Sequence, residues 1–462
     1  MNRKDTIVAI STPVGEGAIG VVRISGKDAL SMGKSLFSPS NPRAPYTPQR
    51  LYYGTIRDSK GKTIDDGFMV YMKAPHSFTG EDVVELQAHG SMVVLEKIVE
   101  AAVALGARPA EPGEFTKRAF LNGKMDLLQA EAVIDLIRAK TDRALQSARG
   151  RLEGRLSKKI ASIKEALLEL ATSLEAELDF AEEELETLPK EALLERLSSV
   201  EKELTDLLAT FKEGRALREG VSVVILGRPN VGKSTLLNLI LREERAIVTP
   251  QPGTTRDLIE EAVSIRGVPV RLVDTAGLRT TEDPIESIGI DRAKRRAERG
   301  ELVLFVVDAS KEEELEKDLS TLESLKEELE DKSFIVVANK MDLVESKEER
   351  VLSLTSIFSG FRVVPISAKT EEGLKELEDA IYKEVCASTE PEELIVSVRH
   401  RDALKRCLEG LERTKSCVER GEPQEIVTVE LRWALTQLGE LTGEVTTEDI
   451  LDRIFSTFCI GK

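Results

Sequence analysis

Cysteine is scarce in this chain, with four cysteines among 462 residues. Four are too few for a disulfide framework, and no Cys-x-x-Cys pair is present to hold zinc, so we expect a reducing, cytoplasmic environment. Long apolar runs are also lacking, since no stretch approaches the roughly 18 apolar residues of a transmembrane helix. A secretory signal is not expected either, because Asp5 interrupts the N-terminal sequence and the apolar run Ile7–Ile10 is short.

The charge of the chain is unevenly distributed. Charged residues make up 32% and hydrophobic residues 41%, an ordinary globular mixture that excludes a disordered, collagen-like or mucin-like chain. The net charge is −17, yet residues 173–205 hold eleven acids and three bases, whereas residues 138–159 hold eight bases and two acids. The simplest interpretation is that both charged runs lie on solvent-exposed faces of helices. The basic run nevertheless means that net acidity does not exclude nucleic acid.

The pattern of apolar residues divides the chain into four parts. Residues 1–120 alternate short β-rich runs with Gly, Pro and Ser, which predicts an α/β domain. Residues 121–218 and 388–462 carry apolar residues at helical spacing, which predicts two parts of one discontinuous helical domain. Residues 219–387 alternate apolar strands with helices, which predicts an inserted domain with a doubly wound, mostly parallel sheet. Its expected strands are Val221–Leu226, Val270–Val273, Leu302–Val307, Phe334–Ala338 and Arg362–Ile366.

A phosphate-binding motif opens the inserted domain. The segment Gly227-Arg-Pro-Asn-Val-Gly232-Lys233-Ser234 fits GxxxxGK[ST] and lies between an expected strand and an expected helix. Glycines allow backbone N–H groups to wrap a phosphate chain, and the helix N-terminus adds partial positive charge. Lys233 would neutralise the β- and γ-phosphates, and the Ser234 hydroxyl would ligate Mg²⁺. The motif predicts a nucleoside triphosphate site.

Three later motifs specify the nucleotide. Asp274-Thr-Ala-Gly277 places a carboxylate where it would hold Mg²⁺ through water, and an N–H where it would contact the γ-phosphate. Asn339-Lys-Met-Asp342 supplies a carboxylate that can accept from the paired donor edge of guanine, which adenine lacks. Ser367-Ala-Lys369 follows the next strand, where a backbone N–H would reach the guanine O6. Together they predict GTP rather than ATP.

The segment between these motifs would carry the switch. Thr255 is the expected hydroxyl that closes on Mg²⁺ while the γ-phosphate is present. Leu278 follows Gly277 and cannot orient the attacking water as a Gln would. The acidic candidates for that role are Glu282, Asp283 and Glu286.

Asn230 in the phosphate loop is a second departure from many GTPases, which carry Gly there. Its amide could hold a monovalent cation that neutralises developing phosphate charge in place of an arginine finger. A local turn hydrogen bond is the alternative interpretation.

The chain resembles the MnmE (TrmE) family of tRNA-modification GTPases over its whole length. Its G-domain motifs GRPNVGKS, PGTTRD, DTAGLR and NKMD are shared by many GTPases. The more specific matches are FTGED and EFTKRAFLNGKMDL in the N-terminal part and CIGK at the C-terminus.

The resemblance implies an N-terminal domain that dimerises and binds 5-formyl- or 5,10-methylene-tetrahydrofolate, a discontinuous helical domain and an inserted Ras-like G domain. It implies a homodimer that joins an MnmG-type flavoprotein in a heterotetramer, with FAD and NADH on that partner and no membrane attachment. Such a complex hydrolyses GTP and installs an aminomethyl or carboxymethylaminomethyl group at C5 of the wobble uridine of certain tRNAs. The folate supplies the one-carbon unit.

The resemblance also implies site residues. It assigns K⁺ to Asn230, Thr249, Gln251 and Thr254, and Mg²⁺ to Ser234 and Thr255. Glu286 is the implied catalytic residue, orienting water through a second water, and potassium would pair two G domains across the nucleotide. The implied folate-binding residues are Arg23, Glu81, Lys124 and Lys462. With the motifs, the expected GTP-binding residues are Asn230, Val231, Gly232, Lys233, Ser234, Thr235, Thr249, Thr254, Thr255, Asp274, Thr275, Ala276, Gly277, Asn339, Lys340, Asp342, Ser367, Ala368 and Lys369.

Two other functions compete with this one. An Era-type ribosome-assembly or signalling switch would need an RNA-binding module and no folate site, so the FTGED block and the CIGK tail argue against it. The other alternative is a helical scaffold whose G domain only regulates assembly. Measurable potassium-dependent turnover of GTP would argue against it. For Cys459, in the CIGK tail, we expect a partly buried structural thiol rather than a reactive one.

Overall fold

The computed structural model describes residues 5–13, 15–41, 46–179, 189–243, 261–273, 294, 297–298, 300–330, 332–386 and 394–462. These residues form two compact units. The first comprises residues 1–134 and 436–462, and the second comprises residues 135–435. The expected boundaries at residues 120, 218 and 387 stay predictions.

A seven-stranded sheet forms the centre of the first unit. Its strand order is β3-β4-β5-β6-β2-β1-β7, antiparallel except where β7 pairs parallel to β1. The strands are β1 (Ile7–Ile10), β2 (Gly17–Ser25), β3 (Phe37–Pro39), β4 (Leu51–Arg57), β5 (Thr63–Met72), β6 (Val83–Gly90) and β7 (Arg108–Pro109). The β-rich runs of the sequence, which predict strands, coincide with β1, β2, β4, β5 and β6; they are Ile7–Ser11, Val21–Ser25, Leu51–Ile56, Phe68–Lys73 and Val83–Ala88.

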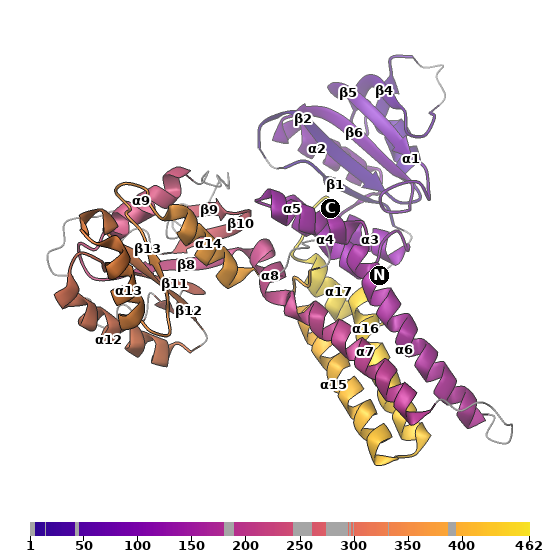
Figure 1. The fold of residues 1–462 in the computed structure, drawn as a ribbon. Helices are drawn as coiled ribbons and strands as arrows, with labels where there is room; N and C mark the ends of the chain where they lie inside the picture. The colour runs from indigo at the N-terminus through magenta and orange to yellow at the C-terminus, as the bar shows by residue number, and fades with distance from the viewer. Residues whose placement is uncertain are drawn as a thin grey trace. The chain divides into compact units, whose positions relative to one another are not determined.

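Two helices cover one face of this sheet. They are α1 (Ala29–Leu36) and α2 (Met92–Ala104) (Figure 1). Leu36 of α1 and Ile98 of α2 are fully buried against sheet residues such as Ile24 and Leu86. Shorter helices complete the unit: α3 (Glu114–Leu121), the first part of α4 (Leu127–Arg138), the end of α16 (Gln424–Thr442) and α17 (Glu448–Phe455).

A six-stranded sheet forms the inserted part of the second unit. Its order is β13-β12-β11-β8-β10-β9, and all neighbours are parallel except β9, which pairs antiparallel to β10 at one edge. The strands are β8 (Val221–Leu226), β9 (Glu261–Ile265), β10 (Val268–Val273), β11 (Leu302–Asp308), β12 (Ser333–Asn339) and β13 (Arg362–Pro365). The expected doubly wound, mostly parallel sheet is confirmed.

Helices pack on both faces of this sheet. Helices α9 (Lys233–Glu243) and α14 (Leu374–Val385) cover one face, while α12 (Glu312–Glu328) and α13 (Lys347–Ile357) cover the other. Adjacent residues of β8 point to opposite faces, so Val223 is buried with α9 and α14, and Val224 is buried with α12. A 3₁₀ turn (Met341–Leu343) follows β12. Both faces are therefore apolar, and polar groups collect at the strand ends.

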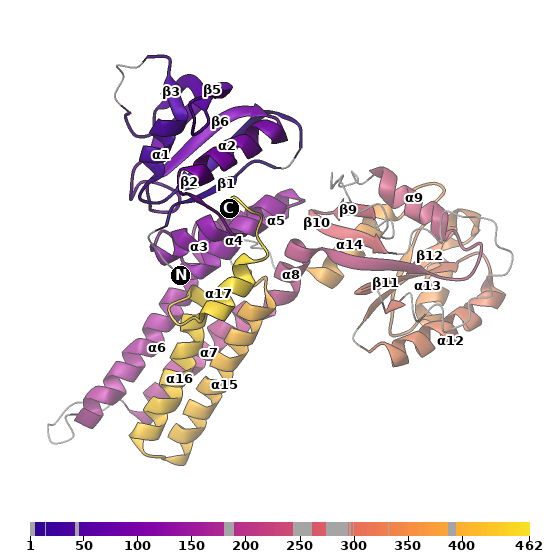
Figure 2. The same ribbon diagram turned by 180° about the vertical axis from the view of Figure 1, so that it is seen from behind.

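Among the described residues, the other helices of the second unit are α5 (Asp142–Leu152), α6 (Arg155–Asp179), α7 (Lys190–Ala209), α8 (Phe211–Glu219) and α15 (Val398–Arg420), together with the end of α4 and most of α16. Helix α7 precedes the inserted sheet and α15 follows it, yet the two pack side by side (Figure 2). Leu197 and Leu204 of α7 and Leu404 and Leu411 of α15 are fully buried. This packing confirms a discontinuous helical domain with an inserted α/β domain.

None of the helices in the described part of the chain has the length and apolar character that crossing a membrane requires.

Candidate functional site

The phosphate loop connects β8 to α9 at the carboxyl edge of the inserted sheet. Its backbone enters the left-handed region at Gly227 (φ 143°), Asn230 (φ 64°) and Gly232 (φ 97°). A Cβ atom on Gly232 would collide with the side-chain amide of Asn339, so glycine is required there for close approach. Lys233, Ser234 and Thr235 form the first turn of α9, and the Lys233 ammonium donates to the carbonyl of Arg228 at 2.7 Å.

Asn339 joins three of the predicted motifs. It lies at the end of β12 and is 2% exposed. Its Nδ2 donates to the carbonyl of Val231 in the phosphate loop at 2.8 Å, and its Oδ1 accepts from the backbone N–H of Ala368 at 2.9 Å. One side chain therefore fixes the phosphate loop to the segment expected to contact the guanine.

The base-binding candidates also lie together. The Ser367 hydroxyl donates to Oδ1 of Asp342 at 2.7 Å, which orients the carboxylate expected to pair with guanine. Lys340 adopts φ 66°, and its ammonium lies 2.6 Å from Oδ2 of Asp308. Burial raises the pKa of Asp308, but hydrogen bonds from Lys340 and Ser310 outweigh burial and leave that pKa below its ordinary value. Lys369 is exposed beside this cluster.

The sequence did not predict a role for Arg228, which lies inside the phosphate loop. Its Nε donates to Oδ1 of Asp318 at 2.6 Å, and its Nη2 donates to Oε2 of Glu314 at 2.7 Å, both on α12. Arg228 therefore anchors the loop to the helix that covers one face of the sheet. No motif marks it, because the position is variable in GxxxxGK[ST] and its acidic partners come from a separate helix.

Several predicted residues lie outside the described part of the chain, and their roles stay predictions. They are Thr249, Gln251, Thr254, Thr255, Asp274, Thr275, Ala276, Gly277 and Glu286, together with Leu278, Glu282 and Asp283.

The four folate candidates all belong to the first unit, where Arg23 and Lys462 are neighbours. Arg23 on β2 pairs with Glu85 on β6 at 2.8 Å, and its guanidinium lies over the rings of Phe78 and Phe115. Burial and the nearby charge of Arg23 lower the pKa of Lys462. The carboxylate of Glu85, which pairs with Arg23, opposes this effect in part by raising the pKa of Lys462.

Glu81 lies in a separate network. Its Oε2 accepts from the Ser25 hydroxyl at 2.7 Å, and both its carboxylate oxygens lie 3.2 Å from Nη1 of Arg118. Arg118 also pairs with Glu114 and Asp5. The sequence did not single out Arg118, although it lies within the EFTKRAFLNGKMDL motif.

Lys124 lies beside Gly80, the residue that precedes Glu81. Its Nζ donates to the carbonyl of Pro75 at 3.0 Å, and its side chain packs against Gly80.

The C-terminal tail packs against β1. Gly461 adopts φ 95°, and a Cβ there would collide with the carbonyl of Ile10. The backbone N–H of Phe115 donates to the carbonyl of Lys462 at 3.2 Å. Cys459 is exposed, so the expectation of a partly buried thiol is wrong; the tail is bound through its backbone and glycine instead.

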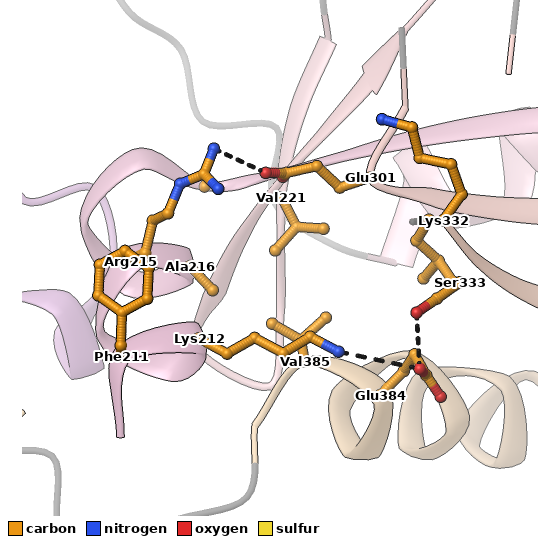
Figure 3. Close-up of a pocket in the computed structure, with 12 residues that line it drawn as sticks. Phe211, Lys212, Arg215, Ala216, Val221, Glu301, Lys332, Ser333, Glu384 and Val385 are labelled. Atoms are coloured by element: carbon orange, nitrogen blue, oxygen red, sulfur yellow. Dashed lines mark hydrogen bonds and ion pairs between the residues drawn. The ribbon is translucent and has the colours of Figure 1, made fainter. Parts of the chain in front are cut away.

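A hollow of about 510 Å³ lies at the opposite, amino-terminal edge of the inserted sheet (Figure 3). Its charged groups are largely paired with one another: Arg215 lies 3.0 Å from Glu301, and Lys212 lies 3.9 Å from Glu384. Ser333 donates to Glu384 at 2.8 Å. These pairs connect α8 to the start of the sheet and to α14. The nucleotide motifs lie at the other edge of the sheet.

Two family models match the chain. The model described as "GTP-binding protein TrmE N-terminus" matches residues 6–124, and the model described as "MnmE helical domain" matches residues 127–459.

Curated relatives match over the full length. A "tRNA modification GTPase MnmE" of Aquifex aeolicus is 49% identical over 99% of this chain and 100% of the relative. The protein of the same description from Symbiobacterium thermophilum is 46% identical, with coverages of 99% and 100%. Among solved structures, Era in complex with MgGDPNP and nucleotides 1506–1542 of 16S ribosomal RNA is 27% identical over 41% of this chain and 66% of that chain, with a TM-score of 0.28.

Proposed function

This chain belongs to the MnmE family of tRNA modification GTPases, and from that premise we propose that it hydrolyses GTP while modifying the wobble uridine of certain tRNAs with a folate-derived carbon. The observation that carries the GTP site is Asn339, whose hydrogen bonds join the phosphate loop to the base-binding segment. The proposed GTP-binding residues are those of the motifs. The match to tRNA modification GTPases over 99% of the chain supports this function over an Era-like switch.

The metal ions have defined positions in this proposal. Ser234, in the first turn of α9, would hold Mg²⁺ through its hydroxyl with Thr255. Asn230, whose backbone adopts φ 64° in the phosphate loop, would hold K⁺ together with Thr249, Gln251 and Thr254. Potassium would supply positive charge against the developing phosphate charge. Glu286 would orient the attacking water.

The one-carbon chemistry would belong to the first unit. Arg23 and Lys462 would bind the folate carboxylates, and Glu81 would accept from the pterin ring with Lys124 beside it. The neighbouring cations Arg23 and Lys462 support this assignment, because a bound carboxylate would relieve their repulsion. The chain would act as a homodimer with an MnmG-type flavoprotein that holds FAD and NADH, and it would add an aminomethyl or carboxymethylaminomethyl group.

A change of base preference tests the GTP site. Asp342→Asn should weaken GTP binding and strengthen xanthosine triphosphate binding, because xanthine presents a carbonyl where guanine presents its amino group. Calorimetric titration of both nucleotides measures the change, with the exposed Asp206→Asn variant on α7 as the control. An unchanged preference in Asp342→Asn would remove this carboxylate from the base site.

A further inference from the structure

A pocket of about 440 Å³ lies between the end of α4, helices α5 and α8, and strand β10, elements that Figure 1 labels. Helix α8 contacts both α5 and β10. The pocket is lined by four arginines and two acids, an excess of two positive charges. The charged lining residues are Arg138, Arg151, Arg218, Arg271, Asp135 and Glu219.

Two polar side chains in this pocket are buried without full hydrogen bonding. Arg151 is 2% exposed and is among the largest fully buried side chains of the described residues. Its Nη1 donates to Oδ2 of Asp135 at 2.7 Å, but its Nε has no partner in the described part of the chain. Ser147, one turn earlier on α5, is 1% exposed, and its hydroxyl has no partner there either. Buried donors of this kind normally have an acceptor.

The acids of the pocket are already engaged. Asp135 accepts from Arg151 through one oxygen and from Nε of Arg218 through the other, at 2.8 Å. Glu219 accepts from Nε of Arg215 at 2.9 Å. Arg271 donates from Nη2 to Ser222, while its buried Nε has no partner among the described residues. Three donors therefore remain that no acid of this pocket satisfies.

We propose that this pocket binds a phosphate dianion, either inorganic phosphate or the phosphate of a monoester. Phosphate oxygens are strong acceptors, which suits two guanidinium groups and a hydroxyl. A phosphate monoester carries about −1.5 to −2 charges at pH 7, which matches the excess of two positive charges, whereas a carboxylate or a phosphodiester carries one. The volume leaves room for a group the size of a nucleoside.

The pocket is separate from the GTP site. Arg271 lies opposite Ser222, the second residue of β8, whereas the phosphate loop follows Leu226 at the other end of that strand. The two sites therefore lie at opposite ends of β8.

Calorimetry on the full-length chain tests the proposal, with GDP and Mg²⁺ at saturation so that the phosphate loop is occupied. The probes are inorganic phosphate, adenosine 5′-monophosphate and adenosine. Phosphate and the monophosphate should bind and adenosine should not. Tighter binding of the monophosphate would identify a monoester as the ligand, and equal or tighter binding of phosphate would identify the free ion.

Two matched pairs of variants locate the binding. Ser147→Ala should weaken phosphate binding about tenfold or more, because a hydrogen bond to a charged group is lost. Ser162→Ala should not, since the Ser162 hydroxyl is exposed and bonds to the Lys159 carbonyl of α6. Arg271→Gln should weaken binding, whereas Arg149→Gln should not, because the Arg149 side chain is 73% exposed and pairs with Glu153 outside the pocket.

Two results would overturn the proposal: no binding of either phosphate probe to the GDP-loaded protein, or equal affinities of Ser147→Ala and the unchanged chain. GTP hydrolysis measured in parallel reports separately on the proposed function.

Discussion

At the scale of single residues, Asn339 shows how one side chain can organise a site whose parts are far apart in sequence. Asn339 is expected from its motif to belong to the GTP site, and in the structure it holds the phosphate loop. Its amide satisfies one buried acceptor and one buried donor at once. Removing it would leave both backbone groups without that partner.

Asn339→Ala should therefore weaken GTP and GDP binding by about 10- to 100-fold, because each lost buried hydrogen bond costs about 1–3 kcal/mol and part of that loss is local relaxation. Nucleotide titration measures the change. Asn238→Ala, at an exposed position of α9, is the matched control and should bind normally. Equal affinities in the two variants would show that the phosphate loop keeps its conformation without Asn339.

A substitution at Asn230 can test the role of potassium without straining the backbone. The φ of 64° at Asn230 is readily adopted by glycine, so Asn230→Gly removes the carboxamide and leaves the loop conformation accessible. We expect GTP binding to persist and the stimulation of hydrolysis by K⁺ over Na⁺ to disappear, a loss of about 10²–10³ in rate. Steady-state phosphate release in the two salts measures it. Equal rates of the unchanged protein in K⁺ and Na⁺ would contradict the potassium mechanism.

At the scale of elements, a charged network attaches helix α3 to β7 and to Asp5, which precedes β1. Glu114 at its start is 2% exposed and pairs with Arg108 on β7 at 2.5 Å and with Arg118 at 2.9 Å. Burial raises the pKa of Glu114, but hydrogen bonds from Arg108, from the backbone of Glu111 and from Arg118 outweigh burial and leave it below the ordinary 4.5. The ionised form is thus favoured by folding.

The lowered pKa of Glu114 determines how the stability of α3 depends on pH. Because the pKa of Glu114 is lowered in the folded state, its stabilisation is complete above about pH 4.5 and is lost as pH falls through the lowered value. Glu114→Gln should destabilise α3 by about 3 kcal/mol at neutral pH and reduce the acid sensitivity. Hydrogen exchange in α3 of the full-length chain measures both effects. The exposed Glu111→Gln is the control, and an equal response of the two variants would contradict the network.

The strands of the six-stranded sheet were largely predictable, because buried strands of a mostly parallel sheet are continuous apolar runs. Strand β8 is found where the run Val221–Leu226 predicts it. Strand β9 was missed, although it pairs with β10 through a turn at Arg266 and Gly267, both at positive φ. We expected the strand to begin at Val270, whereas β10 begins at Val268 and includes Pro269. Pro269 is tolerated because it lies opposite Ser264 of β9, before pairing with β8 begins at Val270.

The motifs also placed the site residues that follow strands, whereas contacts made across the fold were not predictable. Asp342 and Ser367 meet because parallel strands end at one edge. The anchoring of Arg228 by Asp318, and the approach of Arg23 to Lys462, depend on tertiary packing that no local spacing encodes.

At the scale of the whole molecule, the two proposed chemistries, GTP hydrolysis and folate-dependent one-carbon transfer, would belong to different units of the chain. The GTP motifs belong to the second unit, and the folate candidates belong to the first, to which the C-terminal tail returns. The relatives match across both units, which supports a common task for them. The net charge of −17 means that a tRNA would have to meet locally basic surfaces.

Mass spectrometry of wobble uridines tests the proposed function most directly. Cells that lack their own protein of this family would be supplied with this chain and grown with an isotopically labelled one-carbon donor. We predict that an aminomethyl or carboxymethylaminomethyl group reappears at C5 of the wobble uridine and carries the label. Unmodified or unlabelled uridine in cells that contain the full-length, GTP-hydrolysing protein would contradict the folate-dependent modification of tRNA.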